Sequence, residues 1–486
     1  MTITNNPETP AGELALEEVE VALAKAPNNS LLGSSTMRIP FPFGLWIYNA
    51  FVHSEKGLGK WIFKRMAAKP VFISDVNPEL RQKAATNILR DYGFFQGAVT
   101  HDILPDKRDS LKAKIQFHVD LNRPYLLDSV EYRGFTPEMM RIIERGGTRT
   151  ALRRGVQFSV IDLDEERQRL STIFRNVGYY YFRPEFFAFR ADTTQVSGEV
   201  DLRIVPQSGI PANALKNWNI GQVTFNLIGK DGEQPDHTVQ YQDMTLRYHR
   251  SLAIRPEILY RQLRVRTGQR YSQRLVELTQ QKLAELGVFS YTDMQFAPND
   301  SVSESNLLNV NVTSGFDFPY DSRLEFNVTS KSNDYAGPGA TFSISRKNLF
   351  KGGETFTVTA TGSYEWQTKS PVSSNTKFNS WEFGLDAGLS YPFVVFPGWR
   401  MKDYDFTATT AFALNVNQLN RARFFKMLSF GGSMTYGIQR TRVSRHTITP
   451  FSLTFSTLQS RTAEFDEIMA TNPALQKSME NQFIPA

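Results

Sequence analysis

The feature that most constrains this chain is a strict period of two in its apolar residues after Pro319. In seven successive runs, an apolar residue alternates with a polar or small one, and no helical pattern intervenes. Successive side chains of a strand point to opposite faces, so each run predicts a strand with one apolar face. The members of that face are Leu324, Phe326 and Val328; Phe342 and Ile344; Phe356, Val358 and Ala360; Trp381, Phe383, Leu385, Ala387 and Leu389; Tyr404, Phe406, Ala408, Thr410, Phe412, Leu414 and Val416; Leu428, Phe430, Met434, Tyr436 and Ile438; and Phe451, Leu453 and Phe455.

The length of these runs decides what kind of sheet they predict. Several reach or exceed the roughly 9 to 11 residues that a strand needs to cross a bilayer, whereas strands of globular proteins are mostly about 5 or 6 residues long. One apolar and one polar face is the pattern of a transmembrane β-barrel, with lipid outside and water inside. The runs therefore predict a partial antiparallel outer-membrane barrel. A soluble β-sandwich with long hairpins is the alternative.

A second pattern repeats in the first two thirds of the chain. Leu89–Phe95, Phe174–Tyr180 and Leu283–Phe289 share the order apolar, two polar or small, apolar, Gly, apolar, aromatic. Their glycines, at 93, 178 and 287, are 85 (178 − 93) and 109 (287 − 178) residues apart, which is the spacing of small domains. Each signature closes an amphipathic helix, and the Gly suits the left-handed residue that ends one.

Around these signatures the order of elements is strand, helix, helix, strand, strand. Ser159 and Ser272 are placed to cap the helices that follow them. The repeats predict α+β domains with one helical face. The first strands are expected near Leu126–Arg133 and Asn219–Leu227, the shorter helices near Pro137 and Pro256, and the closing strand pairs at Ala188–Ala191 with Glu199–Val205 and at Tyr291–Phe296 with Asn306–Val312.

These patterns divide the chain into five expected parts. They are an irregular segment at 1–45, α+β domains at 46–121, 122–210 and 211–318, and the partial barrel at 319–486. The end of the chain, from Glu464 to Ala486, is polar and helix-like rather than a closing strand.

The residue types that enzymes need are not arranged for catalysis. The chain has no cysteine, which excludes disulfides, thiolate metal sites and Cys nucleophiles. Its six histidines, at 53, 101, 118, 237, 249 and 446, show no close-spaced ligand pattern, and no phosphate-binding loop or nucleophile elbow occurs. We therefore expect no enzyme activity, no metal and no cofactor. A net charge of +6 is also too small to indicate nucleic acid as a partner.

The densest charge cluster is a run of arginines opposed only by Glu257. It comprises Arg247, Arg250, Arg255, Arg261, Arg264, Arg266, Arg270 and Arg274. A solvated helix face is the simpler interpretation. Because the run opens the α+β domain nearest the expected barrel, the alternative is a basic surface beside anionic lipid heads, formed by Arg261, Arg264, Arg266 and Arg270.

With these elements in place, the chain resembles the BamA/TamA-like superfamily of outer-membrane assembly proteins, which join periplasmic POTRA domains to a C-terminal barrel. The most specific stretch is Gly339–Glu354, which is similar to the early barrel hairpin of that family. Its motif residues here are Asn348, Leu349, Phe350, Gly352 and Glu354, of which Asn348 and Gly352 suit a tight turn.

The front of the chain adds a finer resemblance. Ala26–Gly33, Phe43–Asn49 and Lys69–Phe72 resemble the Bacteroidetes-type branch of the superfamily. Family barrels have more strands than the seven runs found, and no secretory signal is visible at Met1, so the expectation is a C-terminally truncated or processed chain.

The resemblance implies a factor that assists folding and insertion of β-barrel proteins, or their translocation, at the outer membrane. Its N-terminal domains would lie in the periplasm. The implied partners are the outer-membrane bilayer, unfolded β-barrel clients and accessory periplasmic or inner-membrane proteins. The alternative functions are a passive outer-membrane pore or receptor with accessory periplasmic domains, and a periplasmic binding module whose β-region is soluble.

Overall fold

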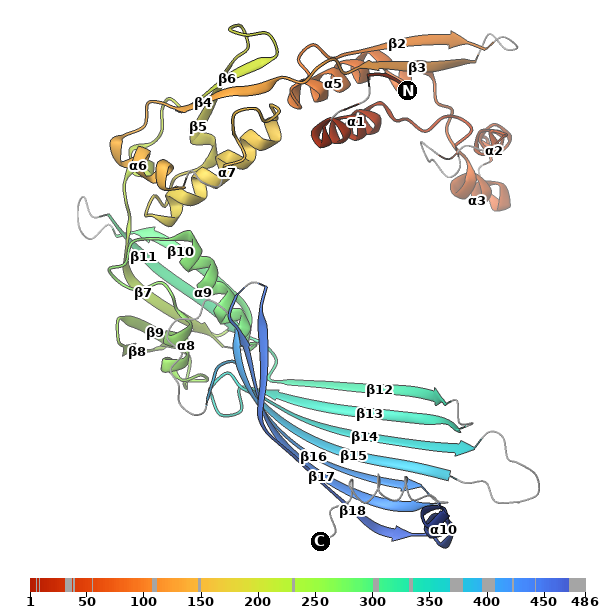
Figure 1. Ribbon diagram of the computed structural model, residues 1–486, viewed down its shortest axis with the longest axis vertical. Coiled ribbons are helices and arrows are strands. Elements are labelled where there is room, and N and C mark those ends of the chain that lie inside the picture. The colour runs from red at the N-terminus through yellow and green to blue at the C-terminus, as the bar shows by residue number, and fades with distance from the viewer. Residues whose placement is uncertain are drawn as a thin grey trace. The chain divides into compact units, whose positions relative to one another are not determined.

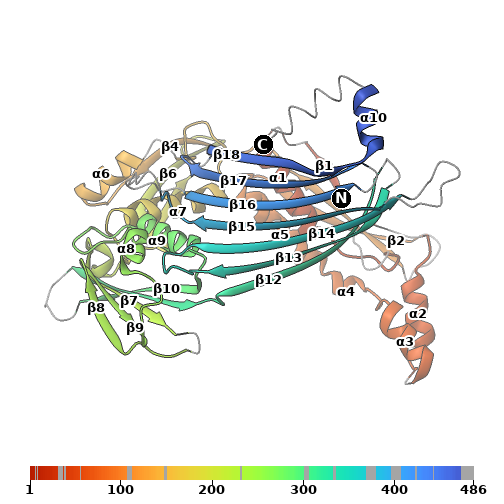
Figure 2. The same cartoon turned by 90° about the horizontal axis from the view of Figure 1, so that it is seen from below.

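The computed structural model divides the chain into two compact units. Unit 1 comprises residues 1–175 and 181–215, and unit 2 comprises residues 176–180 and 216–486. Figures 1 and 2 show the elements of each unit from two directions. The structure describes residues 1–5, 7, 9–30, 37, 40–54, 56–106, 112–146, 150–229, 232–299, 306–331, 335–367, 379–395, 407–421, 424–441 and 443–471.

The first α+β domain of unit 1 begins earlier than expected. Segment 1–45 was predicted to be irregular, but it contains a strand and a helix whose inner face is buried. Thr9 caps that helix through Gly12 N, 3.1 Å from its Oγ1, and Pro10 fills the first turn. The elements are β1 (Thr2–Thr4), α1 (Pro10–Leu23), α5 (Pro78–Asp91), β2 (Ala98–Pro105) and β3 (Ala113–Asp120), with sheet order β1-β3-β2.

The core of this domain lies between the sheet and the two helices. Helix α1 contributes Ala15 and Val19, α5 contributes Leu89, and β3 contributes Val119, all of them inaccessible to solvent. Strand β1 pairs in parallel with β3, so the start of the chain is part of the domain. Between α1 and α5 lie α2 (Phe43–Phe51), α3 (Gly57–Met66) and the single-turn helix α4 (Ile73–Val76), which the sequence did not predict.

The second α+β domain follows the predicted order. It contains β4 (Leu126–Tyr132), α6 (Pro137–Gly146), α7 (Val160–Asn176), a 3-10 turn at Pro184–Phe186, β5 (Phe187–Asp192) and β6 (Glu199–Pro206). The sheet order is β4-β6-β5, with β4 and β6 parallel, so β5 is an edge strand. The N–H of Asp162 lies 3.4 Å from Ser159 Oγ, which confirms the predicted cap.

The third α+β domain lies in unit 2 and carries an extra hairpin. Its sheet has the order β10-β11-β7-β9-β8, in which the β8–β9 hairpin extends the predicted sheet. Ser272 precedes α9 as predicted, but its hydroxyl donates to Asn176 Oδ1 at 3.2 Å instead of capping the helix. The elements are a 3-10 turn at Ala212–Leu215, β7 (Asn219–Ile228), β8 (His237–Tyr241), β9 (Met244–Tyr248), α8 (Pro256–Gln262), α9 (Gln273–Glu285), β10 (Phe289–Pro298) and β11 (Leu307–Phe316).

The helix-ending glycines adopt the conformation that the repeat predicted. Gly93, Gly178 and Gly287 have φ values of +83°, +112° and +66°. An L-residue at such a position would be strained, so the helix–Gly–aromatic signature is explained by backbone geometry.

The rest of unit 2 is a single antiparallel sheet of seven strands. The strands pair in sequence order and are 11 to 17 residues long, as the period-two pattern predicted. Figure 2 shows them side by side, from β12 at one edge to β18 at the other. They are β12 (Tyr320–Ser330), β13 (Tyr335–Lys347), β14 (Thr355–Gln367), β15 (Asn379–Tyr391), β16 (Ala408–Arg421), β17 (Phe425–Gln439) and β18 (Arg445–Arg461), followed by α10 (Ala463–Thr471).

The register of this sheet places the predicted apolar residues directly beside one another. One row across all seven strands is Leu324, Phe342, Ala360, Leu385, Val416, Phe430 and Phe455. The neighbouring row, on the opposite face, is Arg323, Ser343, Thr359, Asp386, Asn415, Gly431 and Thr454. One face is therefore apolar and the other polar. Tyr404 and Phe406, which were expected to open the longest run, lie outside the described residues.

The sheet is open in the part of the chain that the structure describes, because β12 and β18 each pair with one neighbour only. The antiparallel sheet is confirmed, and that it forms part of a transmembrane barrel stays a prediction. Helix α10 confirms the expected helix after the last strand as far as Thr471. Among the helices that the structure describes, none is both long and apolar enough to cross a membrane.

Candidate functional site

The predicted hairpin motif forms a loop that fastens the large sheet to the third α+β domain. The loop, residues 348–354, joins β13 to β14 and reverses the chain through three left-handed residues. These are Asn348, Lys351 and Gly353, with φ values of +58°, +61° and +77°. Asn348 lies in this turn, and the left-handed glycine is Gly353 rather than Gly352.

Asn348 uses both ends of its side-chain amide. Its Oδ1 accepts from Gly353 N at 3.0 Å, which holds the loop closed. Its Nδ2 donates to the carbonyl of Ala253 at 2.8 Å, in the third α+β domain. A second hydrogen bond runs alongside, from Arg255 N to the carbonyl of Lys351, at 3.0 Å. These two hydrogen bonds join the loop to the backbone of the third α+β domain.

Glu354 is fully buried beneath this loop. Its carboxylate accepts from the N–H of Phe350 and, at 2.9 Å, from that of Gly352. A Cβ on Gly352 would lie 2.7 Å from Glu354 Oε2 and 2.9 Å from Arg255 Nη2, so a larger residue there would displace one of these side chains. The Gly and Glu of the motif are thus explained by packing around one buried carboxylate.

The other motif residues have different surroundings. Leu349 is half-buried, and Phe350 is 55% exposed. Next to the loop, at the end of β13, Lys347 Nζ lies 2.6 Å from Asp317 Oδ2. Asp317 belongs to the link between β11 and β12. The hydrogen bond from Lys347, together with the N–H of Phe318, holds the pKa of Asp317 below its usual range.

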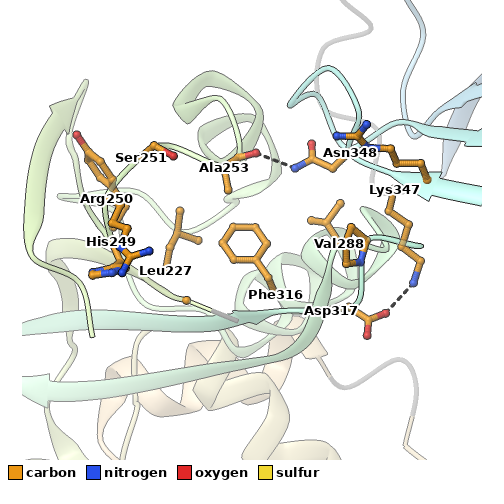
Figure 3. Close-up of a pocket in the computed structure, with 14 residues that line it drawn as sticks. Leu227, His249, Arg250, Ser251, Ala253, Val288, Phe316, Asp317, Lys347 and Asn348 are labelled. Atoms are coloured by element: carbon orange, nitrogen blue, oxygen red, sulfur yellow. Dashed lines mark hydrogen bonds and ion pairs between the residues drawn. The ribbon is translucent and has the colours of Figure 1, made fainter. Parts of the chain in front are cut away.

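A cavity of about 350 Å³ lies between the third α+β domain and this end of the sheet. Figure 3 shows Phe316 at its centre with Leu227 and Val288 beside it. His249 and Arg250 lie at one end of the cavity, and the Asp317–Lys347 pair lies at the other. Arg250 has a left-handed backbone, φ +54°, which is uncommon for a residue with a long side chain.

The cavity wall includes Ser251 and His249, and Asp236 lies 3.2 Å from His249 Nδ1. Among the residues that the structure describes, His249 Nε2 has no hydrogen-bond partner, so Ser251 and His249 do not form the hydrogen bond that a catalytic triad requires. Asp236 also pairs with His237 Nδ1 at 2.7 Å, and the bond from His237, followed by that from Arg250 N, lowers the pKa of Asp236 to about 2. In the described parts of the chain, no group of three or more His, Asp or Glu side chains is placed to hold a metal.

Three of the polar groups around the cavity are basic: Arg250, Arg346 and Lys347. Their carboxylate neighbour in the lining is Asp317. Combined with the apolar centre, this arrangement suits an anionic group carried on an apolar body. It also suits a mechanical role, since the cavity walls come from both the domain and the sheet.

The four arginines of the predicted basic surface do not share one environment in the structure. Arg261 lies over the ring of Phe393 at 4.9 Å, near the end of β15. Arg266 stacks on Tyr260 at 3.6 Å, and Arg264 donates to the carbonyl of Arg261 at 2.7 Å. Arg270, by contrast, lies against Gly178, where a Cβ would be 3.0 Å from Arg270 Cγ. That these four arginines face lipid stays a prediction.

Sequence reasoning missed several residues of this junction. Ala253 and Arg255 take part through backbone atoms, which no residue type reveals. Asp317 lies just before β12 and Lys347 ends β13, so the pair forms only in the observed register of this hairpin. The signal that was available is the Asp–Phe–Pro sequence at 317–319, where a polar residue and a proline interrupt the change from one strand to the next.

Comparison with known proteins gives matches among solved structures only. No protein-family model and no curated protein sequence matches the chain. BamA POTRA3-5 from Haemophilus influenzae shares 14% identity over 54% of this chain and 92% of that chain, with a TM-score of 0.27. BamA from Haemophilus ducreyi lacking POTRA domains 1-3 shares 12% identity over 69% of this chain and 64% of that chain, with a TM-score of 0.37.

CdiB from Acinetobacter baumannii is a further similar structure. It shares 9% identity over 80% of this chain and 71% of that chain, with a TM-score of 0.26. At these levels of identity and superposition, similarity does not assign the chain to a family.

Proposed function

We propose that this chain assists the folding and insertion, or the translocation, of β-barrel proteins at a bacterial outer membrane, without enzyme chemistry or a cofactor. The observation that carries the proposal is the large sheet, in which one continuous row of apolar side chains crosses seven long strands. Many side chains of the same apolar face are exposed, including Phe326 at 78% and Leu414 at 66%, which suits contact with lipid. The α+β domains would then lie in the periplasm.

The α+β domains support the same proposal through their open sheet edges. Strand β5 is an edge of the second domain, and β10 is an edge of the third. An extended client can add to such an edge through main-chain hydrogen bonds, which are largely indifferent to sequence. Burial of the client's apolar surface in lipid supplies the driving force, so the factor only lowers the kinetic barrier.

The junction loop fits this function as a mechanical connection. Asn348, Glu354 and the Lys347–Asp317 pair couple the third domain to the sheet strands at one end. A client held on β10 would consequently be held at a constant distance from the sheet. The partners implied are the bilayer, unfolded barrel proteins and accessory periplasmic or inner-membrane proteins. The Bacteroidetes-type branch is the narrower form of the proposal.

The test uses proline on the β5 edge. Gln207 N donates to the carbonyl of Phe186, and hydrogen-bonded pairs alternate along an antiparallel ladder, so Ala191 directs its N–H away from β6. Ala191→Pro removes this outward donor, whereas Ala191→Thr keeps it and serves as the control. Crosslinking of an unfolded barrel protein to the Pro variant should fall severalfold, and the folding of that protein into liposomes should slow.

A matching variant is available on the third domain, where Thr292→Pro removes an N–H on the free side of β10. If crosslinking and folding rates are unchanged in both Pro variants, client docking by strand addition is wrong.

The alternative is a passive pore or receptor with accessory periplasmic domains. The observation that favours it is the polar face of the sheet, where Ser343 bonds Thr359 at 3.0 Å and Asn417 donates to Glu382 at 2.7 Å. Such a face suits a water-filled lumen. A steady, large conductance in planar bilayers, with no effect on client folding, would favour the pore over the assembly factor.

A further inference from the structure

Helices α2 and α3 form a separate hairpin on unit 1. In Figures 1 and 2 they lie beside each other, apart from the helices α1 and α5 that cover the first sheet. Two contacts close the base of the hairpin. Asn28 pairs its side-chain amide with the backbone of Val71, at 2.8 and 3.1 Å, and Ala68 N donates to the carbonyl of Gly44 at 2.9 Å.

The two helices pack on each other through one aromatic contact and one close approach. The rings of Tyr48 and Phe63 are 5.5 Å apart, and Ile47 of α2 is 8% exposed. Gly59 lies against Phe51, where a Cβ would be 3.2 Å from the ring. The contact between the two helices therefore leaves the other large apolar residues of the hairpin available.

Those remaining residues point to solvent. Phe43 and Trp46 of α2 are 51% and 54% exposed, and Leu58 and Trp61 of α3 are 76% and 60% exposed. Phe43, Trp46 and Ala50 follow one another by three and four positions, so they share one face of α2. Single exposed apolar residues are ordinary, but four large ones on two short helices mark an interaction surface.

The charge of the hairpin is predominantly positive. Residues 43–72 contain five Lys or Arg and one acidic residue, Glu55. Lys60, Lys64 and Arg65 of α3 are exposed and form no ion pair with any residue that the structure describes. Lys64 and Arg65 stand in the last turn of α3, three and four positions from Trp61.

We propose that this hairpin binds the surface of an anionic lipid bilayer, with its exposed aromatic and aliphatic side chains in the head-group region. Exposed Trp, Phe and Leu side chains beside Lys and Arg are typical of helices that lie in a membrane interface. A nucleic acid would use the aromatic rings but not Leu58 or Met66, which are 76% and 49% exposed. The inference concerns unit 1 alone and does not rest on the proposed function.

The experiment uses the absence of cysteine from the chain. Ala50→Cys, on the exposed face of α2, receives an environment-sensitive fluorophore without removing an aromatic residue. Ala84→Cys, exposed on α5 of the same unit, is the matched control. The full chain, kept soluble in a non-ionic amphipol, is mixed with vesicles of phosphatidylcholine alone or of phosphatidylcholine with phosphatidylglycerol.

The probe at position 50 should shift to the blue with anionic vesicles, and nitroxide-labelled lipid should quench it. Raising the salt from about 0.1 M to about 1 M should reverse the shift, because the Debye length falls from about 10 to about 3 Å. Replacing Lys60, Lys64 and Arg65 with Gln should raise the lipid concentration for half-maximal shift on the order of 100-fold, since each basic residue near such a surface contributes roughly fivefold.

The charge control replaces Lys83, Arg90 and Lys114, which are exposed elsewhere on unit 1, and should leave the titration unchanged. An equal shift with neutral vesicles, an equal shift at position 84, or no shift at all would overturn the proposal. The same holds if the two triple variants titrate alike.

Discussion

The side-chain amide of Asn348 is the most testable element of the junction, because its two hydrogen bonds and its backbone conformation can be removed separately. Asn348→Asp keeps the acceptor for Gly353 N and the tolerance for positive φ, but loses the donor to Ala253. Asn348→Gly loses both hydrogen bonds and keeps the backbone conformation. Asn348→Ala loses both bonds and places an Ala at φ +58°.

The expected costs follow from these losses. A buried hydrogen bond contributes about 0.5–1.5 kcal/mol, so Asn348→Gly should destabilise the loop by about 1–3 kcal/mol. Asn348→Asp loses one bond and also sets a carboxylate oxygen against the carbonyl of Ala253, so it should cost more than about 1 kcal/mol. A left-handed backbone adds about 1 kcal/mol for Ala, which brings Asn348→Ala to about 2–4 kcal/mol. The order of the variants is a stronger expectation than any single value.

The assay is amide hydrogen exchange in the full chain, read at Gly353 and at Arg255, whose N–H groups are bonded within this junction. Since about 1.4 kcal/mol is tenfold in an opening equilibrium, exchange there should accelerate roughly 30- to 1000-fold in Asn348→Ala. The matched control is Asn122→Ala, which removes another left-handed Asn and its bond to the carbonyl of Gln96, in unit 1.

Asn122→Ala should leave the exchange at Gly353 and Arg255 unchanged. The reasoning is refuted if Asn348→Ala exchanges within about threefold of the unmodified chain, or if Asn348→Gly is as fast as Asn348→Ala. In the first case the amide would not hold the junction, and in the second the backbone conformation would cost nothing.

Three other expectations concern charge. Replacing Arg261, Arg264 and Arg266 with Gln should weaken binding to anionic liposomes, most at low salt, and equal binding to neutral and anionic liposomes by the unmodified chain would contradict a lipid-facing role. Glu166→Ala should lower the unfolding free energy of the second domain by about 3–5 kcal/mol in denaturant titrations, because the carboxylate is buried and holds Arg169 at 2.6 Å. The pKa of Asp236 is lowered to about 2, so its stabilising contribution is complete above the unfolded value of 3.8 and is lost as the pH falls toward 2. Asp236→Asn should therefore flatten the acid unfolding of the β8–β9 hairpin over that pH window.

The parts of the fold that the sequence predicted are those encoded within a short stretch of chain. A period of two marks a strand whatever surrounds it, and the register then placed Leu385 beside Val416 without any further signal. The helix–Gly–aromatic signature is equally local, because one residue, such as Gly178, has to be left-handed where the helix ends. Both patterns state which way a side chain points, and that is sufficient to identify a sheet or a helix.

The parts that were missed depend on partners distant in sequence or on weak local signals. Helix α1 had a readable start in Thr9 and Pro10, but its apolar spacing was lost among five acidic residues nearby, and its inner face is defined only by contact with α5. The β8–β9 hairpin has two strands of five residues each, too short for a period to be visible. The apolar stretch Phe43–Phe51 is too short to span a membrane and lacks a marked polar face, and in the structure it forms α2, the first helix of a hairpin.

The candidate junction was predicted as a motif and not as a site. Asn348 and Glu354 were identified, but Ala253 and Arg255, which hydrogen-bond to the loop at Asn348 and Lys351, are more than ninety residues away, and no charge or spacing rule connects them. The burial of Glu354 could not be expected either, since a Gly–Gly–Glu turn between two strands is usually solvated. The loop is hydrogen-bonded to the third α+β domain, and the local sequence does not encode that contact.

The two faces of the large sheet can be distinguished by a matched pair of substitutions. Leu414, in the middle of β16, is 66% exposed on the apolar face, between Ala387 and Gly432 on the adjoining strands. Ser433, on β17, lies on the polar face between Ala413 and Ser452. If the apolar face contacts lipid, Leu414→Arg should cost about 2–4 kcal/mol near the middle of the bilayer, whereas Ser433→Arg should cost little because its side chain points to water. Flotation of the full chain with liposomes after refolding should therefore fall strongly for Leu414→Arg and remain near the unmodified level for Ser433→Arg. Equal flotation of the two variants would show that the apolar row does not face lipid, and a soluble sandwich would then explain the alternation better.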